Sequence, residues 1–492
     1  MTIAVEWITN NERPLHVQIA DSLRGRFERG DFHPADHLPT TRDLARDLGV
    51  SRSTVVRAYE QLTREGWIEG HVGMGTLVRA KSSTETRATP NWDLLLTDRV
   101  RDQNLEYADV LRMLSRTDLL SFAGGLPSPE FYPGEPLQQI AGEVLRQQGP
   151  RLLQWCPVDG YPPLRSWIAE RIESTPENVL VLSGSTQGLH LIAQAFIDPG
   201  DVVLVESPTY AGALRSFRAA GARIVSVPSG PDGIDLEELE TTLQRVRPKF
   251  LYVIPTYHNP TGSSLTVEKR RRLLTLAARY GLPVVEDDAY SALRYDGPRY
   301  PSLRSLDENG LVIYVSTFSK AIFPGLRVGW LVAPADLVRR LSGLRNLIDL
   351  FTNSLTQATL YEFCKRGLLE AHLQHVRPIY EERRDAMAAA LRRYGPGISF
   401  DVPHGGLFIW ARLPRGIDSR RLLEESINLG LGFMVGPLFY AEGGGEDRIR
   451  LCFACHPPDA IAAGIRKLGL ALKQVQPDSG DWREARAKGF VV

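Results

Sequence analysis

Residues 316–327 read STFSKAIFPGLR, a segment in which one lysine stands among hydroxyl side chains. Lys320 lies between Thr317 and Ser319 on one side and Arg327, seven residues later, on the other. A lysine amine forms a Schiff base with an aldehyde, and a guanidinium with nearby hydroxyls holds a phosphate through charge-assisted hydrogen bonds. The segment therefore predicts a covalent site for pyridoxal 5'-phosphate, although most lysines are solvated surface charges.

The segment lies in a region where short apolar runs alternate with helical patterns. The runs that we expect to be strands are residues 179–182, 202–205, 223–227, 250–254, 284–286 and 312–315. Such alternation predicts an α/β domain whose sheet is largely parallel, with functional loops at the strand ends.

Polar residues follow three of these runs. Residues 183–188 (SGSTQG) precede a helical stretch, so they form either a phosphate-binding helix start or a simple glycine turn. Asn259 lies in the turn HNPTG and either shapes that turn or hydrogen-bonds a phenolic oxygen. Asp287 is either a solvated strand-end carboxylate or the partner of a protonated pyridine nitrogen.

Length and composition limit the classes of function. A chain of 492 residues predicts two or more domains, and the 58 basic and 58 acidic side chains cancel, so no global field attracts nucleic acid. The first residues lack the apolar core of a secretory signal, and no apolar run is long enough to span a bilayer. With four cysteines in so long a chain, we expect a reducing, cytoplasmic setting without membrane association.

Residues 452–456 read CFACH, the spacing of covalent haem attachment. That attachment requires export, which the first residues do not support. We interpret residues 449–455 as a buried strand in which cysteine acts as a small hydrophobic residue. No second ligand pair stands at metal spacing, so we expect no metal site.

The first 80 residues have a different pattern, of three short helices and a hairpin. Leu15, Ile19, Leu23 and Phe27 recur at helical spacing. A second helix is capped by Thr40 or Thr41, and after a short turn Ser51 can cap a third. Two helices joined so tightly indicate a helix-turn-helix, and the hairpin with the tip HVGMG at residues 71–75 indicates a wing.

In a helix-turn-helix, the first residues of the second helix face base edges. The residues that we expect there are Arg52, Ser53, Thr54 and Arg57. Arg42 and His71 of the wing are expected to contact phosphate. Residues 1–80 hold ten arginines, no lysine and eleven acidic residues, so binding would depend on how charge is distributed over this domain. A small helical adaptor is the alternative.

The residues favour DNA binding, because the segments LPTTRDLA at 38–45, LGVSRSTV at 48–55 and GMGT at 73–76 resemble the winged-helix domain of GntR-type regulators. We expect this domain to occupy residues 1–80. A polar linker is expected at 81–111, a cofactor domain at 112–476 and a loosely ordered tail at 477–492.

From about residue 120 to 470 the chain resembles fold type I pyridoxal-phosphate aminotransferases, nearest in pattern to the kynurenine and 2-aminoadipate group. The resemblance implies a largely parallel large domain and a small C-terminal α+β domain. It places the Schiff base on Lys320 and the pyridinium partner at Asp287. Asn259 and Tyr290 would bond the phenolic oxygen, and Tyr210 would stack on the ring. It assigns the phosphate to Ser185, Thr186, Thr317, Ser319 and Arg327.

Arg450 matches the arginine that binds a substrate carboxylate in that family. Trp155 stands where the family usually has a tyrosine that reaches the phosphate across a dimer interface.

A GntR-type winged helix, a linker and an aminotransferase domain in one chain are similar to the MocR/GabR class of regulators. The resemblance implies a head-to-tail homodimer that binds operator DNA. It implies that an amino compound is sensed through an external aldimine formed in place of the bond to Lys320. Two alternatives remain open at this point: a working aminotransferase, and a sensor of pyridoxal phosphate that controls vitamin B6 synthesis.

Overall fold

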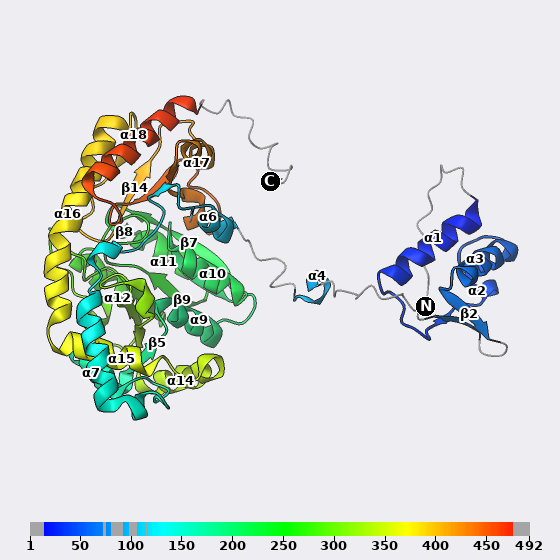
Figure 1. Cartoon of the computed structure of the whole chain (residues 1–492), viewed down its shortest axis with the longest axis horizontal. Helices are drawn as coiled ribbons and strands as arrows, with labels where there is room; N and C mark the ends of the chain where they lie inside the picture. Colours follow the sequence, from blue (N-terminus) through cyan, green and yellow to red (C-terminus); the bar gives the residue numbers. More distant parts are fainter. Residues whose placement is uncertain (1–13, 72–74, 80–91, 98–105, 115, 476–492) are drawn as a thin grey trace. The chain divides into compact units, whose positions relative to one another are not determined.

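The computed structural model describes the chain except residues 1–13, 72–74, 80–91, 98–105, 115 and 476–492. It divides into two compact units, Met1–Leu96 and Thr97–Val492 (Figure 1). The predicted tail at 477–492 lies outside the described residues. Within the predicted linker, the described residues include a short helix α4 (Trp92–Leu95) and most of α6 (Glu106–Leu114). Within the described part of the chain, no helix combines the length and apolarity needed to cross a membrane.

The first unit is a winged helix-turn-helix. Its helices are α1 (Leu15–Glu28), α2 (Thr41–Asp47) and α3 (Arg52–Arg64). Its strands β1 (His37–Leu38), β2 (Ile68–His71) and β3 (Gly75–Val78) form an antiparallel sheet in the order β1-β3-β2. The hairpin prediction included β2 and β3 but not the two-residue β1.

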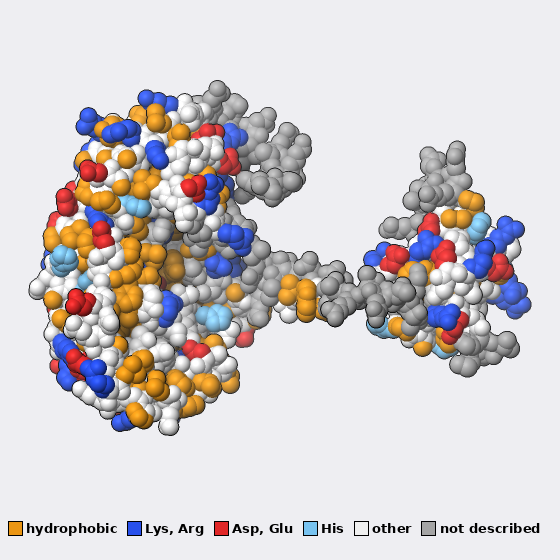
Figure 2. Space-filling model, in the orientation of Figure 1, with side chains coloured by type: hydrophobic (Ala, Val, Ile, Leu, Met, Phe, Trp, Pro, Cys, Tyr) orange, Lys and Arg blue, Asp and Glu red, His pale blue; other side chains and the backbone are white. Residues whose placement is uncertain are grey.

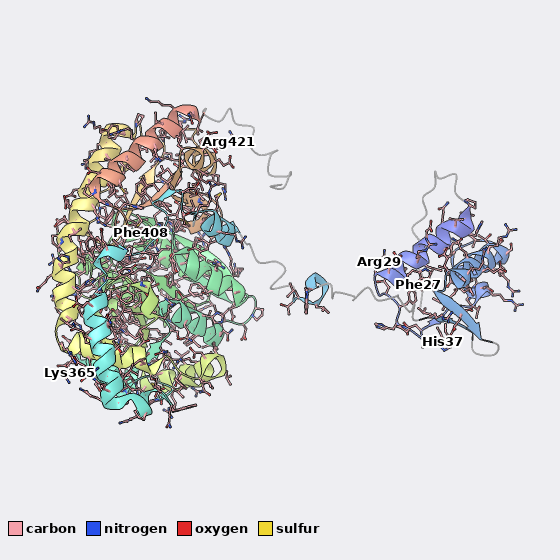
Figure 3. The ribbon with its side chains drawn as sticks, viewed as in Figure 1. Phe27, Arg29, His37, Lys365, Phe408 and Arg421 are labelled. Atoms are coloured by element: carbon pink, nitrogen blue, oxygen red, sulfur yellow. The ribbon has the colours of Figure 1, made fainter. Side chains whose placement is uncertain are left out.

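The helix starts of this unit are fixed by their caps. Thr40, rather than Thr41, caps α2, because its hydroxyl accepts a hydrogen bond from the Asp43 amide at 3.2 Å. Ser51 caps α3 in the predicted way, accepting from the Thr54 amide at 3.2 Å. The apolar faces meet in one core, in which Phe27, labelled in Figure 3, stacks on Trp67.

The second unit is built around an eight-stranded sheet. Its strands are β5 (Val179–Leu182), β6 (Val202–Ser207), β7 (Arg223–Gly230), β8 (Gly233–Ile234), β9 (Pro248–Val253), β10 (Val284–Asp288), β11 (Val312–Thr317) and β12 (Gly329–Val332). Their spatial order is β5-β12-β11-β10-β9-β6-β7-β8. The pairings from β11 through β7 are parallel, whereas β12 is antiparallel to both neighbours and β8 to β7. The prediction of a largely parallel sheet is confirmed, and β12 is a strand that the prediction did not include.

Helices cover both faces of this sheet, so its central strands are buried on both sides. One face packs on α9 (Ser185–Phe196), α10 (Ala211–Ala219) and α14 (Ala335–Asp349). The other packs on α11 (Leu236–Arg245), α12 (Val267–Tyr280) and α13 (Leu303–Leu306). The remaining large helices are α7 (Gly134–Leu152), α8 (Pro162–Arg171), α15 (Ser354–Lys365) and the long α16 (Leu368–Tyr394).

The C-terminal part forms a smaller α+β layer. Strands β13 (Ser399–Phe400), β14 (Phe408–Arg412), β16 (Met434–Val435) and β17 (Arg448–Cys452) pair antiparallel in the order β13-β14-β17-β16. Helices α17 (Ser419–Asn428) and α18 (Pro458–Gln474) accompany them, and β15 (Leu431–Gly432) pairs with β4 (Leu120–Ser121). The strand predicted at 449–455 ends at Cys452, and Cys455 lies in the following turn.

Candidate functional site

The predicted cofactor residues gather at the carboxyl ends of the parallel strands. Asp287 lies on β10, Thr317 ends β11, and Lys320 follows in the next turn. Asn259 and Tyr210 lie in the segments after β9 and β6. Ligand sites of open α/β sheets form at this edge, because the strand ends bring loops from distant parts of the sequence together.

The Lys320 amine is enclosed and held by backbone. Its Nζ donates to the Gly125 carbonyl at 2.6 Å. Burial, reinforced by the charge of Arg450, lowers the pKa of Lys320 to about 8. The lowered pKa raises the fraction of neutral, nucleophilic amine near neutral pH well above that of an exposed lysine.

Asp287 presents one satisfied and one free oxygen. Its Oδ2 accepts from the Tyr252 hydroxyl at 2.8 Å, whereas Oδ1 is buried with no hydrogen-bond partner among the described residues. Burial raises the pKa of Asp287 to about 6, against the lowering effect of the Tyr252 hydrogen bond. A buried acceptor without a donor fits a protonated pyridine nitrogen, which is the group that the cofactor would bring.

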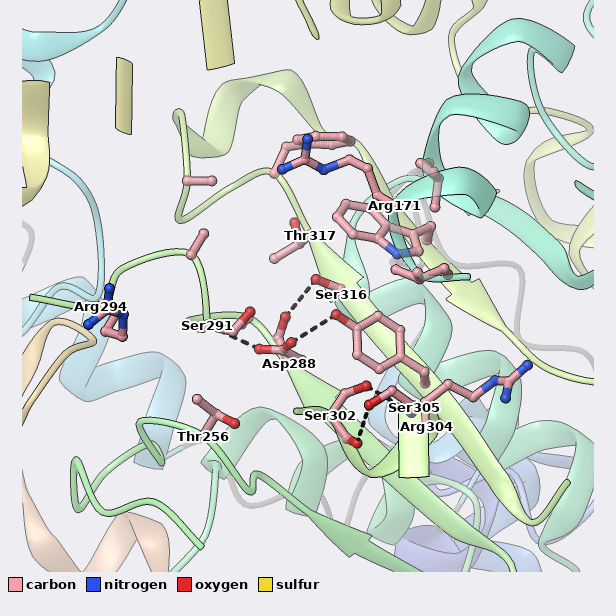
Figure 4. Close-up of a pocket in the computed structure, with 18 of the residues that line it drawn as sticks. Arg171, Thr256, Asp288, Ser291, Arg294, Ser302, Arg304, Ser305, Ser316 and Thr317 are labelled. Atoms are coloured by element: carbon pink, nitrogen blue, oxygen red, sulfur yellow. Dashed lines mark hydrogen bonds between the residues drawn. The ribbon is translucent and has the colours of Figure 1, made fainter. Parts of the chain in front are cut away.

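The neighbouring carboxylate, Asp288, lies on the opposite face of the sheet and has different hydrogen-bond partners from Asp287. Because successive strand residues point to opposite faces, Asp288 faces a pocket of about 590 Å³ on the other side of the sheet (Figure 4). Its Oδ1 accepts from the Ser291 amide at 3.1 Å and its Oδ2 from the Tyr314 hydroxyl at 2.8 Å. Both oxygens are satisfied within the protein, so Asp287 is the better partner for a ligand.

Asn259 joins Tyr290 to Arg450. Its amide nitrogen donates to the Tyr290 hydroxyl at 3.3 Å, and its amide oxygen accepts from Arg450 Nη1 at 2.9 Å. Burial raises the pKa of Tyr290 above its ordinary range, so this phenol stays protonated. The group can therefore donate or accept hydrogen bonds at a ligand oxygen.

Arg450 is a buried guanidinium that is only partly satisfied. Its Nη2 donates to the Ala123 carbonyl at 2.6 Å, and its Nε is buried without a partner among the described residues. The guanidinium lies 4.1 Å from the centroid of the Phe408 ring, which Figure 3 labels. Stacking fixes its plane, and a fixed planar fork suits a carboxylate.

The residues predicted for the phosphate meet at the start of α9. Ser185 and Thr186 form its first turn, where amide groups are free to bind an anion. Gly184 precedes them at φ 98°, and a Cβ there would lie 2.6 Å from Arg327 Nη2. Arg327 donates to the Ser183 carbonyl at 2.8 Å and has φ 49°, a left-handed conformation that costs a non-glycine residue energy.

The remaining phosphate and ring residues lie around this helix start. The Thr317 hydroxyl donates to the Ser319 hydroxyl at 2.9 Å, and both side chains are buried. Tyr210 is half-buried at the start of α10, and burial raises its pKa to about 12 while a hydrogen bond with Thr186 opposes the shift. Trp155 is 59% exposed and its ring contacts Phe351.

The predicted DNA-binding residues lie on exposed parts of the first unit. Arg52, Ser53 and Arg57 are exposed on α3, and Thr54 is partly buried as it completes the cap. Arg42 is exposed on α2, and Arg52 Nε is 3.5 Å from the Thr41 hydroxyl. His71 ends β2, and its side chain lies outside what the structure describes.

Three contributors to the site were not predicted, one side chain and two backbone carbonyls. Tyr252 belongs to a run interpreted as an apolar strand, although a buried tyrosine hydroxyl needs a partner, which was the available signal. The carbonyls of Ala123 and Gly125 carry no side-chain signal at all. They reach Arg450 and Lys320 from more than 190 positions away in the sequence.

Known proteins match the chain in two parts. Residues 130–468 match the family Aminotransferase class I and II, and residues 15–78 match the gntR family of bacterial regulatory proteins. The 2-aminoadipate transaminase of Thermus thermophilus is 42% identical, over 74% of this chain and 93% of its own length. The crystal structure of LysN, an α-aminoadipate aminotransferase from Thermus thermophilus, was solved with N-(5'-phosphopyridoxyl)-L-leucine. It covers 78% of this chain and 99% of its own, with a TM-score of 0.75 and 40% identity.

A relative with both parts covers nearly the whole chain. The probable rhizopine catabolism regulatory protein MocR of Rhizobium meliloti is 31% identical over 92% of this chain and 93% of its own length. The cofactor of the aminotransferase fold is pyridoxal phosphate, and the free oxygen of Asp287 and the enclosed amine of Lys320 fit that group. The chain therefore belongs to the class I and II aminotransferase family and, through its fused GntR-type domain, is a transcriptional regulator of the MocR type.

Proposed function

We propose that this protein acts in the cytoplasm as a homodimeric, DNA-binding regulator whose aminotransferase domain detects an amino compound with a carboxylate. The observation that carries the proposal is the pairing of Lys320 and Arg450. Both lie in one enclosed site, and both donate to the backbone of residues 123–125. The Lys320 amine is where an amino group would compete, and Arg450 is where a carboxylate would bind.

Bound pyridoxal phosphate supplies an aldehyde for an amine and an electron-poor ring. Asp287 would hold the ring nitrogen through its free oxygen, and Asn259 with Tyr290 would hold the phenolic oxygen. The first turn of α9, Thr317, Ser319 and Arg327 would hold the phosphate. Tyr210 would cover the ring.

A ligand carboxylate at Arg450 would change what this side chain contacts. It would compete with the Ala123 carbonyl and the Asn259 oxygen for the guanidinium, because a bidentate carboxylate bonds more strongly than either neutral acceptor. A ligand amine would release Lys320 from its place near Gly125. Such differential contacts are what can shift a protein between two conformations.

On the first unit, the exposed start of α3 would enter the major groove. Arg52, Ser53, Thr54 and Arg57 would read base edges, and Arg42 and His71 would contact phosphates. The proposal predicts that the protein prefers its own upstream DNA over a random duplex of the same length at moderate salt. Binding to both duplexes with equal affinity would overturn it.

Three variants distinguish the DNA-binding part of the proposed function from its cofactor-binding and ligand-binding part. Arg52→Ala should lose DNA binding and keep the cofactor, with Arg46→Ala, another exposed arginine of the same unit, as its matched control. Lys320→Ala should lose covalent cofactor attachment and keep DNA binding. Arg450→Met should abolish the response to amino acids. A response that persists in Arg450→Met would favour a sensor of pyridoxal phosphate itself.

A second candidate function is an active aminotransferase. It is favoured by the 42% identity to the 2-aminoadipate transaminase and by the complete set of polar groups at the site. Steady conversion of an amino acid and a keto acid, followed over many turnovers, would support this function. A single shift of the cofactor absorbance that then persists would support the sensor.

The homodimer is proposed from apolar side chains on the surface. Leu153, Trp155, Leu347 and Leu350 are 66%, 59%, 82% and 51% exposed. The ends of α7 and α14 come together where Trp155 contacts Phe351. Hydrophobic side chains also gather over this part of the visible face (Figure 2). A patch of this kind marks a protein interface, and a second copy would cover it.

A further inference from the structure

Two cysteines lie together beside the cofactor site. Cys452 ends β17 and is fully buried, whereas Cys455 in the following turn is partly exposed. Their sulfur atoms are 3.8 Å apart, and either thiol can donate to the other. The sequence interpretation treated both as small hydrophobic residues, but a Cys-x-x-Cys pair at this separation is also a redox unit.

The pair contacts the same segment that holds Lys320 and Arg450. The Cys455 thiol donates to the Leu126 carbonyl at 3.2 Å, and the Cys452 amide donates to the Phe122 carbonyl at 2.8 Å. Between these two carbonyls lie those of Ala123 and Gly125, which accept from Arg450 and Lys320. Residues 122–126, here named the carbonyl segment, therefore join the cysteines to the proposed cofactor and carboxylate groups.

The carbonyl segment is closely packed against Phe408. A Cβ at Gly125 would lie 2.7 Å from Phe408, the ring against which Arg450 stacks. Loss of the hydrogen bond from Cys455 to the Leu126 carbonyl would therefore also shift the adjacent Gly125 carbonyl, which accepts from Lys320. The two other cysteines, Cys156 and Cys364, are buried elsewhere in the fold.

We propose that Cys452 and Cys455 form a reversible disulfide when the protein meets a hydroperoxide, and that this modification alters the site of Lys320 through the carbonyl segment. The sulfurs must approach to about 2 Å, so Cys455 must leave the Leu126 carbonyl. Burial alone would raise the pKa of Cys452. The Cys455 hydrogen bond, the Ala454 amide, Arg450 and Lys320 oppose this and bring the pKa to about 7. A thiolate is thus accessible to the pair.

The chemistry balances with hydrogen peroxide as oxidant. The hydrogen bond between the two sulfurs lowers the pKa of Cys452 and raises that of Cys455, so the thiolate lies on Cys452. This thiolate attacks one peroxide oxygen. An S–O bond forms, the O–O bond breaks, and the released hydroxide takes up a proton to become water. The Cys455 sulfur then attacks the sulfenic sulfur of Cys452, so that an S–S bond forms, the S–O bond breaks and a second water leaves. The two thiols lose two hydrogen atoms, and a dithiol reductant restores them.

The first test uses mass spectrometry on the full chain loaded with pyridoxal phosphate. After peroxide treatment, free thiols are alkylated under denaturing conditions and the protein is digested with trypsin. Both cysteines fall in the peptide of residues 451–466. After peroxide we expect this peptide to be two hydrogen atoms lighter than the dithiol form and to carry no alkyl group. Reduction with dithiothreitol before alkylation should restore the doubly alkylated peptide. A peptide that stays doubly alkylated, or that gains oxygen irreversibly, would overturn the proposal.

Two variants control this measurement. Cys455→Ser removes the partner thiol, so peroxide should leave no disulfide in the peptide. Cys156→Ser removes a buried thiol elsewhere, and the disulfide should form as in the unmodified protein. Peroxide-dependent cross-links that involve Cys156 or Cys364 instead would also contradict the assignment.

A second readout tests the link to Lys320 and rests on the proposed function. Lys320 is faced by Arg450, Cys452, Asp287 and Cys455, and negative charge on the cysteine pair raises its pKa. Oxidation removes that charge. The midpoint of the pH dependence with which Lys320 attaches pyridoxal phosphate should therefore move to lower pH in oxidised protein, but not in peroxide-treated Cys455→Ser.

An unchanged midpoint after complete disulfide formation would overturn the link. If reduced protein attaches no cofactor at Lys320, the proposed function fails, whereas the mass measurement still decides whether the disulfide forms.

Discussion

At the scale of single residues, the chemistry depends on how burial changes the ionisation of Lys320. Its pKa of about 8 means that protonated and neutral amine exchange within the physiological range. Burial disfavours the charged form, so the neutral nucleophile predominates above that pH. We expect attachment of pyridoxal phosphate to cofactor-free protein to accelerate as the pH rises through about 8 and then to level off.

Rapid mixing with detection of the cofactor absorbance measures this profile. Arg450→Met removes the second cause of the lowered pKa and should move the midpoint to higher pH. A midpoint in the ordinary range of an exposed lysine would contradict the enclosed position of the amine.

A second prediction at this scale concerns Tyr252, which donates to Asp287. Tyr252→Phe would leave a buried carboxylate without that donor and raise the pKa of Asp287 further. A buried acceptor that loses its donor costs about 1–3 kcal/mol, so we expect retention of pyridoxal phosphate to weaken by about tenfold.

Dissociation constants from fluorescence quenching check this expectation. The matched control is Tyr314→Phe, which removes the same hydroxyl from Asp288 on the other face of the sheet. An equal loss in both variants would show that the effect arises from a general disturbance of the sheet rather than from Asp287.

At the scale of elements, the start of α3 combines a cap with the predicted DNA contacts. The Ser51 hydroxyl accepts from the Thr54 amide, and an alanine at such a cap costs about 1 kcal/mol. Ser51→Ala should increase the hydrogen exchange of α3 amides by about fivefold, measured by mass spectrometry on the full chain.

Ser53→Ala is the matched control, because the Ser53 hydroxyl lies 2.9 Å from that of Ser51, whereas the cap bond to the Thr54 amide is made by Ser51. It should change exchange much less and weaken DNA binding. If Ser53→Ala exposed α3 as much as Ser51→Ala, the cap would not be what fixes this helix start.

At the scale of the whole molecule, the prediction concerns association. Leu347 is the most exposed of the large apolar residues near the ends of α7 and α14. The proposed dimer would cover this position, and a charge there would have to be desolvated. Leu347→Asp should therefore convert the proposed dimer into monomers at micromolar concentration. Sedimentation velocity on the full chain measures the change.

Leu470→Asp is a suitable control, because Leu470 is a half-exposed leucine on α18, away from that patch in sequence. Dissociation by both variants, or by neither, would mean that the interface lies elsewhere.

Local sequence patterns were sufficient to predict the division into a winged helix-turn-helix and an α/β domain, the main strands of the large sheet and the residue types available at their ends. The Ser51 cap follows from local patterns, because a cap depends on neighbouring residues. Local patterns also marked Lys320 as a candidate, whereas the assignment of Asp287 rested on the resemblance to aminotransferases. Local patterns did not predict the two-residue β1 or the strand β12, since the strands with which they pair lie far away in the chain.

Packing on the two faces of the sheet determines which of two adjacent carboxylates keeps a free oxygen. Asp287 and Asp288 are chemically identical in sequence, but they point to opposite faces of β10 and meet different partners. The same holds for Cys452 and Cys455, whose significance comes from the carbonyl segment brought beside them. Burial and long-range hydrogen bonds arise from packing, and packing is what turns residue types into a site.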